Sequence, residues 1–314
     1  MAELLFLSRT DVESLLDLDE LLEALEDGLR RLSDGTASVP PRAGAEAPGG
    51  LLLAMPGSVP DLALVTKLVS VFPGNHEHGL PSHFALIVAL DPETGQPLAV
   101  MDGTHVTAVR TAATSALAWR AVGRPDARVL AILGAGVQGG SHLDAFDHVG
   151  AFSEVRVASR THDHAVALAE QHPRARAVAT FEEAVRGADV VCCCTDSRDP
   201  VIRREWLAPA AHVSSVGTGE EVDGATIDAA SVFVEWRGAV TNAPPAGAVE
   251  LQGRDPESVT EIGEVLAGTR PGRRSDDEVT VWKSTGHAVE DAAAAALVLR
   301  RATGEGRGTV LTLD

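Results

Sequence analysis

A glycine-rich loop that directly follows a short apolar run constrains the fold of this 314-residue chain more than any other feature. The run 128–133 reads RVLAIL, which is typical of a buried β-strand, and the loop GAGVQG follows at 134–139. A helical pattern occupies 137–148, and the next strand is expected at 155–159. A strand, a G-x-G-x-x-G loop and a helix in this order predict a Rossmann-type unit that binds the pyrophosphate of a dinucleotide.

The three glycines of this loop are expected to do different things. Gly134 permits the tight turn, Gly136 lets backbone amides approach a phosphate, and Gly139 allows the helix to pack closely on the strand. The N-terminus of the helix then stabilises the bound anion. The cofactor-binding candidates in the loop are Gly134, Gly136, Val137, Gln138 and Gly139.

The chain beyond the loop alternates between strand-like and helical segments. Strands are expected at 175–180, 189–195, 212–217 and 232–236, and helices at 161–171, 181–187 and about 287–302. Strand–helix alternation of this kind predicts βαβ units and therefore a parallel sheet.

The residues before the loop show a different pattern. We expect a capped amphipathic helical region at 8–32, loop with short strands at 35–60, strands at 62–72, 83–90 and 97–101, and a helix at 104–122. The turn DPETGQP at 91–97 joins the last two strands as an antiparallel hairpin. The sequence predicts an α/β protein with a Rossmann-type parallel-sheet domain at 119–299. An α+β domain with antiparallel strands is predicted at 1–118 together with about 300–314.

Composition and charge exclude several classes of protein. A formal net charge of −19 argues against nucleic acid or a membrane surface as partner, because both need a basic face. The absence of tyrosine excludes enzymes that use a tyrosine acid, including the short-chain dehydrogenase type. No apolar run is long enough to span a bilayer, and the N-terminus lacks the basic region of a signal peptide. The three contiguous cysteines at 192–194 do not resemble a disulfide framework, which indicates a reducing compartment. We therefore predict a cytoplasmic protein.

The end of the second strand of the Rossmann-type unit bears on the choice of cofactor. An acid is expected there when the 2′-hydroxyl of NAD is bound, but the chain has Ser159, Arg160 and Thr161. An arginine flanked by hydroxyls suits a 2′-phosphate, so NADP(H) is favoured over NAD(H).

Three basic residues in the first half of the chain stand in unusual surroundings. Lys67 is one of only two lysines and lies among apolar residues in a predicted strand, where a cation needs an anionic partner or a shifted pKa. Arg110 lies on an otherwise small and apolar helix, and Arg42 follows Pro40-Pro41. Together with a dinucleotide site, these cations indicate a small carboxylate held against a nicotinamide.

Several motifs occur together, and their order carries a resemblance. They are MDGTHVTAVRTAATSALA at 101–118, AILGAGVQG at 131–139 and VWKSTGHAVEDAAAA at 281–295. Lys67 with Asn75, and TDSRDPVI at 195–202, fit the same pattern. On these residues the chain resembles the ornithine cyclodeaminase/mu-crystallin family over nearly its whole length.

The resemblance implies a homodimer whose first domain supplies the dimer interface and the substrate pocket. It implies that Arg42, Lys67 and Arg110 bind the carboxylate of the substrate. The residues that it places at the cofactor are Thr111, Thr195, Val216, Gly217, Ser284 and Gly286.

Two departures from the family pattern argue against ornithine cyclisation. Ornithine cyclodeaminases have a glutamate just before a Met-Pro dipeptide, whereas Ala54 precedes Met55 here, and Met55 becomes a candidate substrate contact. They also have a catalytic aspartate two residues after a Val-Gly pair, a position that is Gly219 in this chain.

Other residues are alternatives for the missing acid. A short acidic run follows at Glu220, Glu221 and Asp223, although a solvated acidic loop is the favoured interpretation. His83 begins a strand and is a candidate proton donor, because histidine titrates near neutral pH. Its neighbours His76 and His78 lie in a Gly/Pro loop without a fixed scaffold, so no metal site is expected.

These observations favour an NAD(P)H-dependent oxidoreductase that reduces the imine of a small 2-oxo acid to an amino acid. Lys67, Arg110 and His83 are the catalytic candidates, and Arg42 and Met55 complete the predicted substrate contacts. The alternatives are an alanine-type dehydrogenase, an enzyme that condenses an amino acid with an oxo acid, a cyclodeaminase, and a non-catalytic crystallin-like protein that binds NADP(H).

Overall fold

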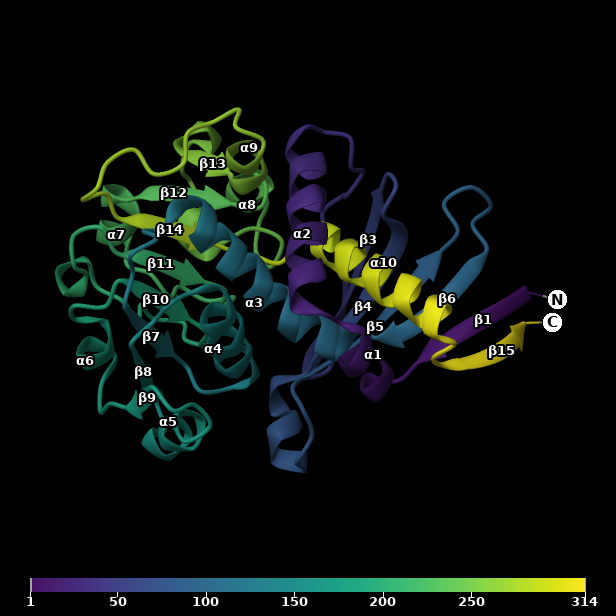
Figure 1. Cartoon of the computed structure of the whole chain (residues 1–314), viewed down its shortest axis with the longest axis horizontal. Coiled ribbons are helices and arrows are strands. Elements are labelled where there is room, and N and C mark those ends of the chain that lie inside the picture. Colours follow the sequence, from purple (N-terminus) through teal and green to yellow (C-terminus); the bar gives the residue numbers. More distant parts are fainter. Residues whose placement is uncertain (1, 314) are drawn as a thin grey trace. The chain divides into compact units, whose positions relative to one another are not determined.

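The computed structural model describes residues 2–313, which form two units (Figure 1). One unit holds the residues up to Arg110 together with those from His287 onward, and the other is Thr111–Gly286. The chain therefore returns to the first unit at residue 287, earlier than the expected position near residue 300. The reason is that helix α10 (Ala288–Glu305) packs against elements of the first unit, namely α2 (Leu18–Ser33), β3 (Gly50–Val59) and β4 (Ala63–Val71).

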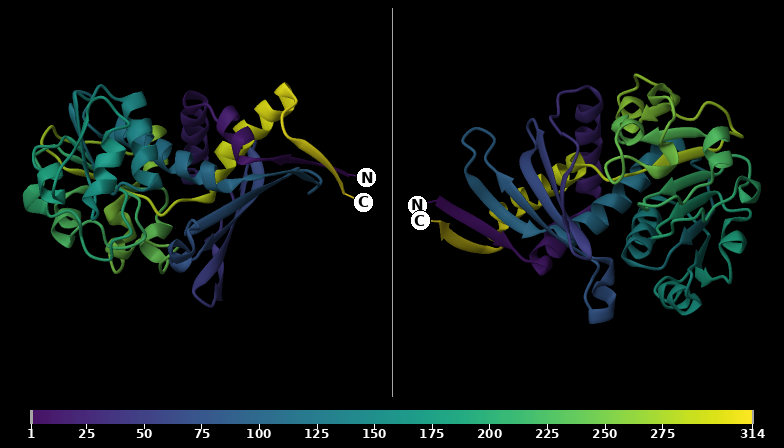
Figure 2. Two further views of the ribbon diagram at one scale, coloured as in Figure 1. Left: turned by 90° about the horizontal axis from the view of Figure 1, so that it is seen from below. Right: turned by 180° about the vertical axis from the view of Figure 1, so that it is seen from behind.

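The first unit is built on a seven-stranded sheet with the order β15-β1-β6-β5-β4-β3-β2. All neighbouring strands are antiparallel except β1 and β6, and the pairing of β1 with β15 joins the two ends of the chain (Figure 2). The strands are β1 (Ala2–Leu7), β2 (Ala43–Ala47), β3 (Gly50–Val59), β4 (Ala63–Val71), β5 (His83–Leu90), β6 (Pro97–Asp102) and β15 (Thr309–Leu313).

Helices α1 (Arg9–Leu15) and α2 (Leu18–Ser33) replace the single helical region expected at 8–32. The break has a local cause, because each helix has its own N-cap. The Ser8 hydroxyl accepts from the amide of Asp11, and the Asp17 carboxylate accepts from that of Glu20. A short 3₁₀ helix, η1 (Pro73–His78), precedes β5.

Alternation along the strands gives the first sheet one buried face. Met55, Lys67, Ile87 and Met101 stand opposite one another in β3, β4, β5 and β6, and all four are 4% exposed or less. They therefore form a row on one face, the face against which α10 packs. Lys67 is the only charged member of this row.

The second unit contains the predicted Rossmann-type sheet, with eight parallel strands in the order β13-β12-β14-β11-β10-β7-β8-β9. Strand β7 lies between β8 and β10, so the strand order reverses beside it, where ligands bind in open α/β sheets. The strands are β7 (Val129–Leu133), β8 (Glu154–Ala158), β9 (Ala175–Ala177), β10 (Val190–Cys193), β11 (His212–Ser215), β12 (Ser231–Val234), β13 (Val259–Glu261) and β14 (Thr280–Lys283).

Helices cover this sheet. They include the end of α3 (Gly103–Val122), α4 (Val137–Val149), α5 (His162–Ala169), α6 (Phe181–Val185), α7 (Gly224–Ala229), α8 (Gly238–Thr241) and α9 (Ile262–Leu266), with 3₁₀ turns η2 (Arg204–Trp206), η3 (Val249–Leu251) and η4 (Pro256–Ser258). Cys192 belongs to the core on one face of the sheet and Cys193 to the core on the other. Among residues 2–313, no helix has the length and apolar content needed to cross a bilayer.

Candidate functional site

The glycine loop between β7 and α4 requires glycine at two positions, Gly134 and Gly139. Gly134 has φ +101°, and a Cβ atom there would lie 2.4 Å from the carbonyl oxygen of Cys194. A Cβ on Gly139 would lie 2.0 Å from the carbonyl oxygen of Gly134. Any side chain at either position would therefore push apart the loop, α4 and the end of β10.

The N-terminus of α4 offers room for an anion. Gly136 is its N-cap and provides no side-chain cap, and a Cβ on this exposed glycine would meet no atom within 4 Å. Val137 is 73% exposed, although it is apolar. The side-chain oxygen of Gln138 is buried and accepts no hydrogen bond from residues 2–313. An open, uncapped helix end behind a glycine turn fits the pyrophosphate of a dinucleotide.

The ribose-binding candidates follow β8. Arg160 is exposed and forms a long ion pair with Asp196, with 3.7 Å between Nη1 and Oδ1. Thr161 is the N-cap of α5, but its side chain makes no cap hydrogen bond. Ser159, the residue that directly follows β8, is partly buried. The same corner thus holds a cation suited to a 2′-phosphate and an acid suited to a 2′-hydroxyl.

Glu221 organises the carboxyl ends of β10 and β11. Its Oε1 accepts from the amide and the hydroxyl of Thr195, both at 2.7 Å. Its Oε2 accepts from the hydroxyl of Ser215 at 2.8 Å and the amide of Gly217 at 2.7 Å. Glu221 is fully buried, so the expectation of a solvated acidic loop is wrong at this residue. Four donors explain how a carboxylate can be buried there.

Lys283, at the end of β14, belongs to the same network. Its ammonium donates to Glu250 at 3.0 Å, to the Ser215 hydroxyl at 3.1 Å and to the Gly217 carbonyl at 2.8 Å. All three ammonium donors are thus satisfied within the second unit, and the side chain is 1% exposed. This lysine holds together the loops that carry the predicted cofactor residues Thr195 and Val216.

A second buried acid fixes the segment that follows β14. The hydroxyl of Ser284 and the amide of Gly286 both donate to Glu235 Oε1, the latter at 3.0 Å. Gly286 has φ +70°, which favours glycine. Thr111, another predicted cofactor residue, is buried on α3.

The predicted carboxylate-binding cations form a cluster within the first unit. Lys67 is 2% exposed, and its ammonium lies 2.9 Å from Oδ1 of Asp291. Arg110 is 3% exposed and donates through Nε to the same oxygen at 3.1 Å and through Nη1 to Glu290. Both acids begin helix α10 and are fully buried. The structure thus places two of the three predicted cations on two adjacent acids.

The charges in this cluster shift one another's protonation. Burial and the charge of Arg110 lower the pKa of Lys67 to about 8. Asp291 acts in the other direction and raises it, but the lowering effects are larger. Burial acts to raise the pKa of Asp291, but Lys67 and Arg110 hold it below its usual value. Arg42, half-buried ahead of β2, acts on both groups through its charge. Burial lowers the pKa of His287 to about 3, so this neighbour is neutral at physiological pH.

The remaining predicted residues lie at different distances from Lys67. Met55 stands directly opposite it on β3. His83 pairs with Val71, four residues farther along β4, or roughly 13 Å at the rise of a strand. His83 is exposed and contacts the hydroxyl of Ser82. The first unit therefore does not bring His83 to the cation cluster.

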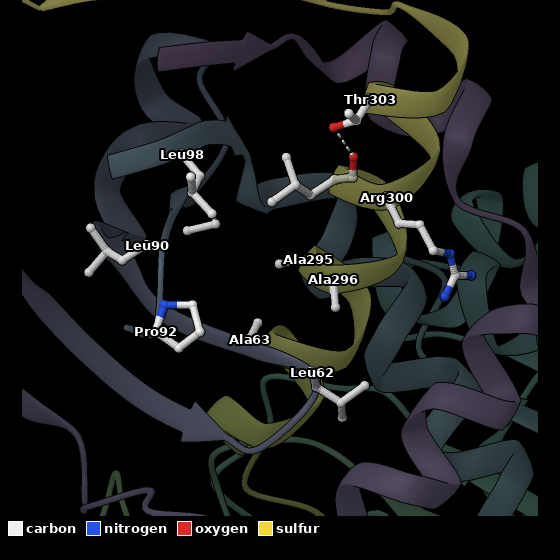
Figure 3. Close-up of a pocket in the computed structure, with 11 residues that line it drawn as sticks. Leu62, Ala63, Leu90, Pro92, Leu98, Ala295, Ala296, Arg300 and Thr303 are labelled. Atoms are coloured by element: carbon white, nitrogen blue, oxygen red, sulfur yellow. Dashed lines mark hydrogen bonds between the residues drawn. The ribbon is translucent and has the colours of Figure 1, made fainter. Parts of the chain in front are cut away.

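The first unit also contains an apolar cavity of about 360 Å³ that includes none of the predicted residues (Figure 3). It lies between α10 and the strands β4, β5 and β6, with Ala295 and Leu299 of α10 in its wall. Arg300 and Thr303 are its polar members. Arg300 is paired with Glu20 at 2.7 Å. No group of three or more histidine, cysteine or acidic residues suited to a metal occurs in residues 2–313.

Sequence reasoning missed the acids Glu235, Glu250, Glu290 and Asp291. A signal was present for the last two, because they interrupt the small-residue run AVEDAAAA at the start of a buried helix. A buried helix face tolerates acids only when cations neutralise them, so these acids could have been matched to Lys67 and Arg110.

The fold and the glycine loop define a protein with a Rossmann-type unit and a separate unit that carries a buried cation cluster. The chain belongs to the ornithine cyclodeaminase/mu-crystallin family, whose model matches residues 2–306. This confirms the family resemblance found in the sequence.

Known relatives cover most or all of the chain. The ketimine reductase mu-crystallin of Rattus norvegicus is 40% identical over 79% of this chain and 80% of its own length. The Δ1-pyrroline-2-carboxylate reductase of Thermococcus litoralis, solved with NADH and L-proline, is 34% identical, with a TM-score of 0.92 over 97% of this chain and 99% of that one. An archaeal alanine dehydrogenase, solved as a dimer with bound NAD, is 33% identical, with a TM-score of 0.89 over the whole of both chains. These structures confirm the predicted fold class.

Proposed function

We propose that this chain is an NAD(P)H-dependent oxidoreductase that reduces the imine of a small 2-oxo acid to an amino acid. The observation that carries the proposal is that the two buried lysines, Lys67 and Lys283, differ in how many hydrogen-bond acceptors their ammonium groups have. Lys283 has three acceptors, whereas Lys67 has one acceptor, Asp291, among residues 2–313. A buried ammonium with two unused donors beside an arginine is a site for a carboxylate. The names of the three relatives, which are those of imine reductases and an amino-acid dehydrogenase, support this proposal.

Each cation has a defined task in this mechanism. Lys67 and Arg110 bind the carboxylate of the imino acid, and Arg42 adds a third positive charge. When bound at the glycine loop, a nicotinamide cofactor supplies the hydride that the reaction requires. The π electron pair of the C=N bond moves to the nitrogen, which already carries a proton when the substrate arrives as an iminium ion. The chain then needs to supply orientation and charge, but no proton donor at the position of Gly219.

The residues around Lys67 favour an uncharged side chain on the substrate. Its neighbours on the same face are Met55, Ile87 and Met101, and Leu53 next along β3 is also buried. None of these could neutralise the distal amine of a diamine such as ornithine. A cyclic or aliphatic imino acid therefore fits better than the substrate of a cyclodeaminase.

The cofactor is proposed to be NADP(H) in preference to NAD(H). The support is Arg160, exposed at the end of β8, together with the hydroxyls of Ser159 and Thr161. Asp196 lies close enough to Arg160 to compete with a 2′-phosphate, and two of the similar structures were solved with NADH or NAD. The preference over NAD(H) is therefore expected to be moderate.

Amination of a free oxo acid is a second candidate activity. The 33% identity to an alanine dehydrogenase over the full length of both chains favours it. This reaction starts from pyruvate and ammonia, and the carboxylate would bind the same cations. A condensing enzyme would use an amino acid in place of ammonia.

We also propose that the chain forms a homodimer through its first unit. The sheet face opposite Lys67 exposes four large apolar side chains, between 37% and 48% each: Leu52, Leu68, Phe84 and Leu86. A cluster of this kind is typical of an interface. The archaeal relative is a dimer. Light scattering of the purified chain measures the mass directly.

A cofactor-oxidation panel tests the proposed activity. NADPH and NADH are each mixed with Δ1-pyrroline-2-carboxylate, Δ1-piperideine-2-carboxylate, and pyruvate with ammonia or methylamine, and absorbance at 340 nm is followed. We expect turnover with at least one cyclic imine. Tight NADPH binding without turnover of any member would instead identify a non-catalytic binding protein.

A further inference from the structure

We propose that Asp291 is a positioning residue of the proposed imine reduction, which holds Lys67 and Arg110 as a single clamp for the substrate carboxylate. One oxygen, Oδ1, accepts from the Lys67 ammonium at 2.9 Å and from Nε of Arg110 at 3.1 Å. A shared acceptor fixes the spacing of two cations that come from different elements, β4 and α3. The inference rests on the proposed function, because it concerns what this clamp binds.

Burial makes this contact strong. Asp291 is fully buried, and both of its partners are at most 3% exposed, so little solvent screens the three charges. A buried acid with two cationic partners stays ionised, which agrees with its lowered pKa. Its second oxygen, Oδ2, accepts no hydrogen bond from residues 2–313. The hydrogen bonds of this carboxylate are therefore those that Oδ1 accepts from Lys67 and Arg110.

Asp291 also controls the charge of Lys67. Arg110 from α3 and Arg42 ahead of β2 act on this lysine through their charges, and both lower its pKa. His287 and Glu290 stand beside Asp291 at the start of α10. The strands on either side contribute only Met55 and Ile87. His287 is neutral, and Glu290 is hydrogen-bonded to Arg110. Asp291 is therefore the group that favours the protonated form of Lys67, whereas burial, Arg110 and Arg42 favour the neutral form.

The scarcity of lysine permits a direct test that does not need enzymatic activity. Lys67 and Lys283 are the only lysines, so protein labelled with [13Cε]lysine gives two side-chain signals, and the Lys67→Arg variant assigns them. The signal of Lys67 is titrated from about pH 4 to 11 in the wild type, in Asp291→Asn and in Glu290→Gln, so that a midpoint lowered from about 8 stays within the range. Lys283 serves as an internal reference, because its partner Glu250 is unchanged.

We expect Asp291→Asn to lower the pH midpoint of Lys67 by about one to three units, the usual effect of removing a close opposite charge. The matched control Glu290→Gln removes a neighbouring buried acid that is hydrogen-bonded to Arg110, whereas the Lys67 ammonium donates to Asp291, so the Lys67 midpoint should move much less than in Asp291→Asn. The alkaline limb of kcat/KM should move together with the midpoint in each variant. An unchanged midpoint in Asp291→Asn would overturn the proposal.

A second variant covers the case in which Asp291→Asn does not fold. Asp291→Glu keeps the charge but moves the carboxylate, so the Lys67 midpoint should stay while KM for the imino acid rises about tenfold and kcat changes less. An unchanged KM in Asp291→Glu would also overturn the positioning role. If the midpoint moves as expected but no imine is reduced by the wild type, the proposed function fails and the charge coupling stands.

Discussion

Replacement of Lys67 by methionine tests the proposed carboxylate site most directly. The substitution keeps a long side chain in the row of Met55, Ile87 and Met101 but removes the ammonium and its two unused donors. A carboxylate that loses one charge-assisted hydrogen bond in a buried site loses about 2 to 3 kcal/mol. At about 1.4 kcal/mol per factor of ten, kcat/KM should fall by about 30- to 150-fold.

The assay separates this loss from damage to the fold and to the cofactor site. Initial rates with Δ1-pyrroline-2-carboxylate give kcat/KM, and quenching of NADPH fluorescence gives the cofactor Kd. The Kd should not change, because the glycine loop lies in a different unit from Lys67.

The same substitution should also lower the stability of the protein. Breaking a buried ion pair costs about 3 to 5 kcal/mol of stability. The lower end is expected, because Arg110 still pairs with Asp291.

A double variant is the control for stability. Lys67→Met with Asp291→Asn removes both charges of the pair, so part of the lost unfolding free energy should return, while kcat/KM should stay low. Wild-type kcat/KM in the single variant would refute the assignment of Lys67 to the substrate carboxylate.

Three further predictions concern the cofactor and alkaline pH. Arg160→Ala should weaken NADPH more than NADH in fluorescence titrations, and equal losses would remove the support for a 2′-phosphate contact. Gly139→Ala should weaken both cofactors at least tenfold, because its Cβ would lie 2.0 Å from the Gly134 carbonyl oxygen; unchanged affinity would exclude this loop as the pyrophosphate site. Because Lys67 has a pKa of about 8 when folded and 10.5 when unfolded, the unfolded chain binds more protons between these values. The stability of the wild type relative to Lys67→Met should therefore rise between pH 8 and 10.5, by about 3 kcal/mol in urea titrations, and a flat difference would contradict the buried ammonium.

The parts of the fold that follow from local sequence were predictable. The strand, glycine loop and α4 lie within about twenty residues, and their chemistry is set by the loop itself. The hairpin of β5 and β6 was also expected, because its turn composition is local. Strand β14 is not among the strands predicted from the sequence, although most of its residues belong to the motif at 281–295 and it lies between β11 and β12 inside the sheet.

The partners of the site residues were not predictable in the same way. Lys67 and Asp291 are separated by 224 positions, and Arg110 and Glu290 by 180. Periodicity identifies the buried face of a helix or strand, but it does not tell which buried faces meet. Glu221 shows the same limit, because an acidic run is typical of a solvated loop unless distant donors such as Thr195 surround it.

We expect the charge of the cation cluster, rather than the charge of the chain, to decide the class of substrate. Three cations, Arg42, Lys67 and Arg110, lie near two acids, Glu290 and Asp291. If each acid offsets one cation, one positive charge remains to match a single carboxylate. A second carboxylate on the substrate would meet the apolar side chains of Met55, Ile87 and Met101 with no further cation to pair with, at a cost of about 2 to 3 kcal/mol or roughly 100-fold in kcat/KM. Methylimines formed from pyruvate and from oxaloacetate differ by this one group. Equal or better turnover of the oxaloacetate imine would show that a further cation reaches the substrate, and that this charge count is wrong.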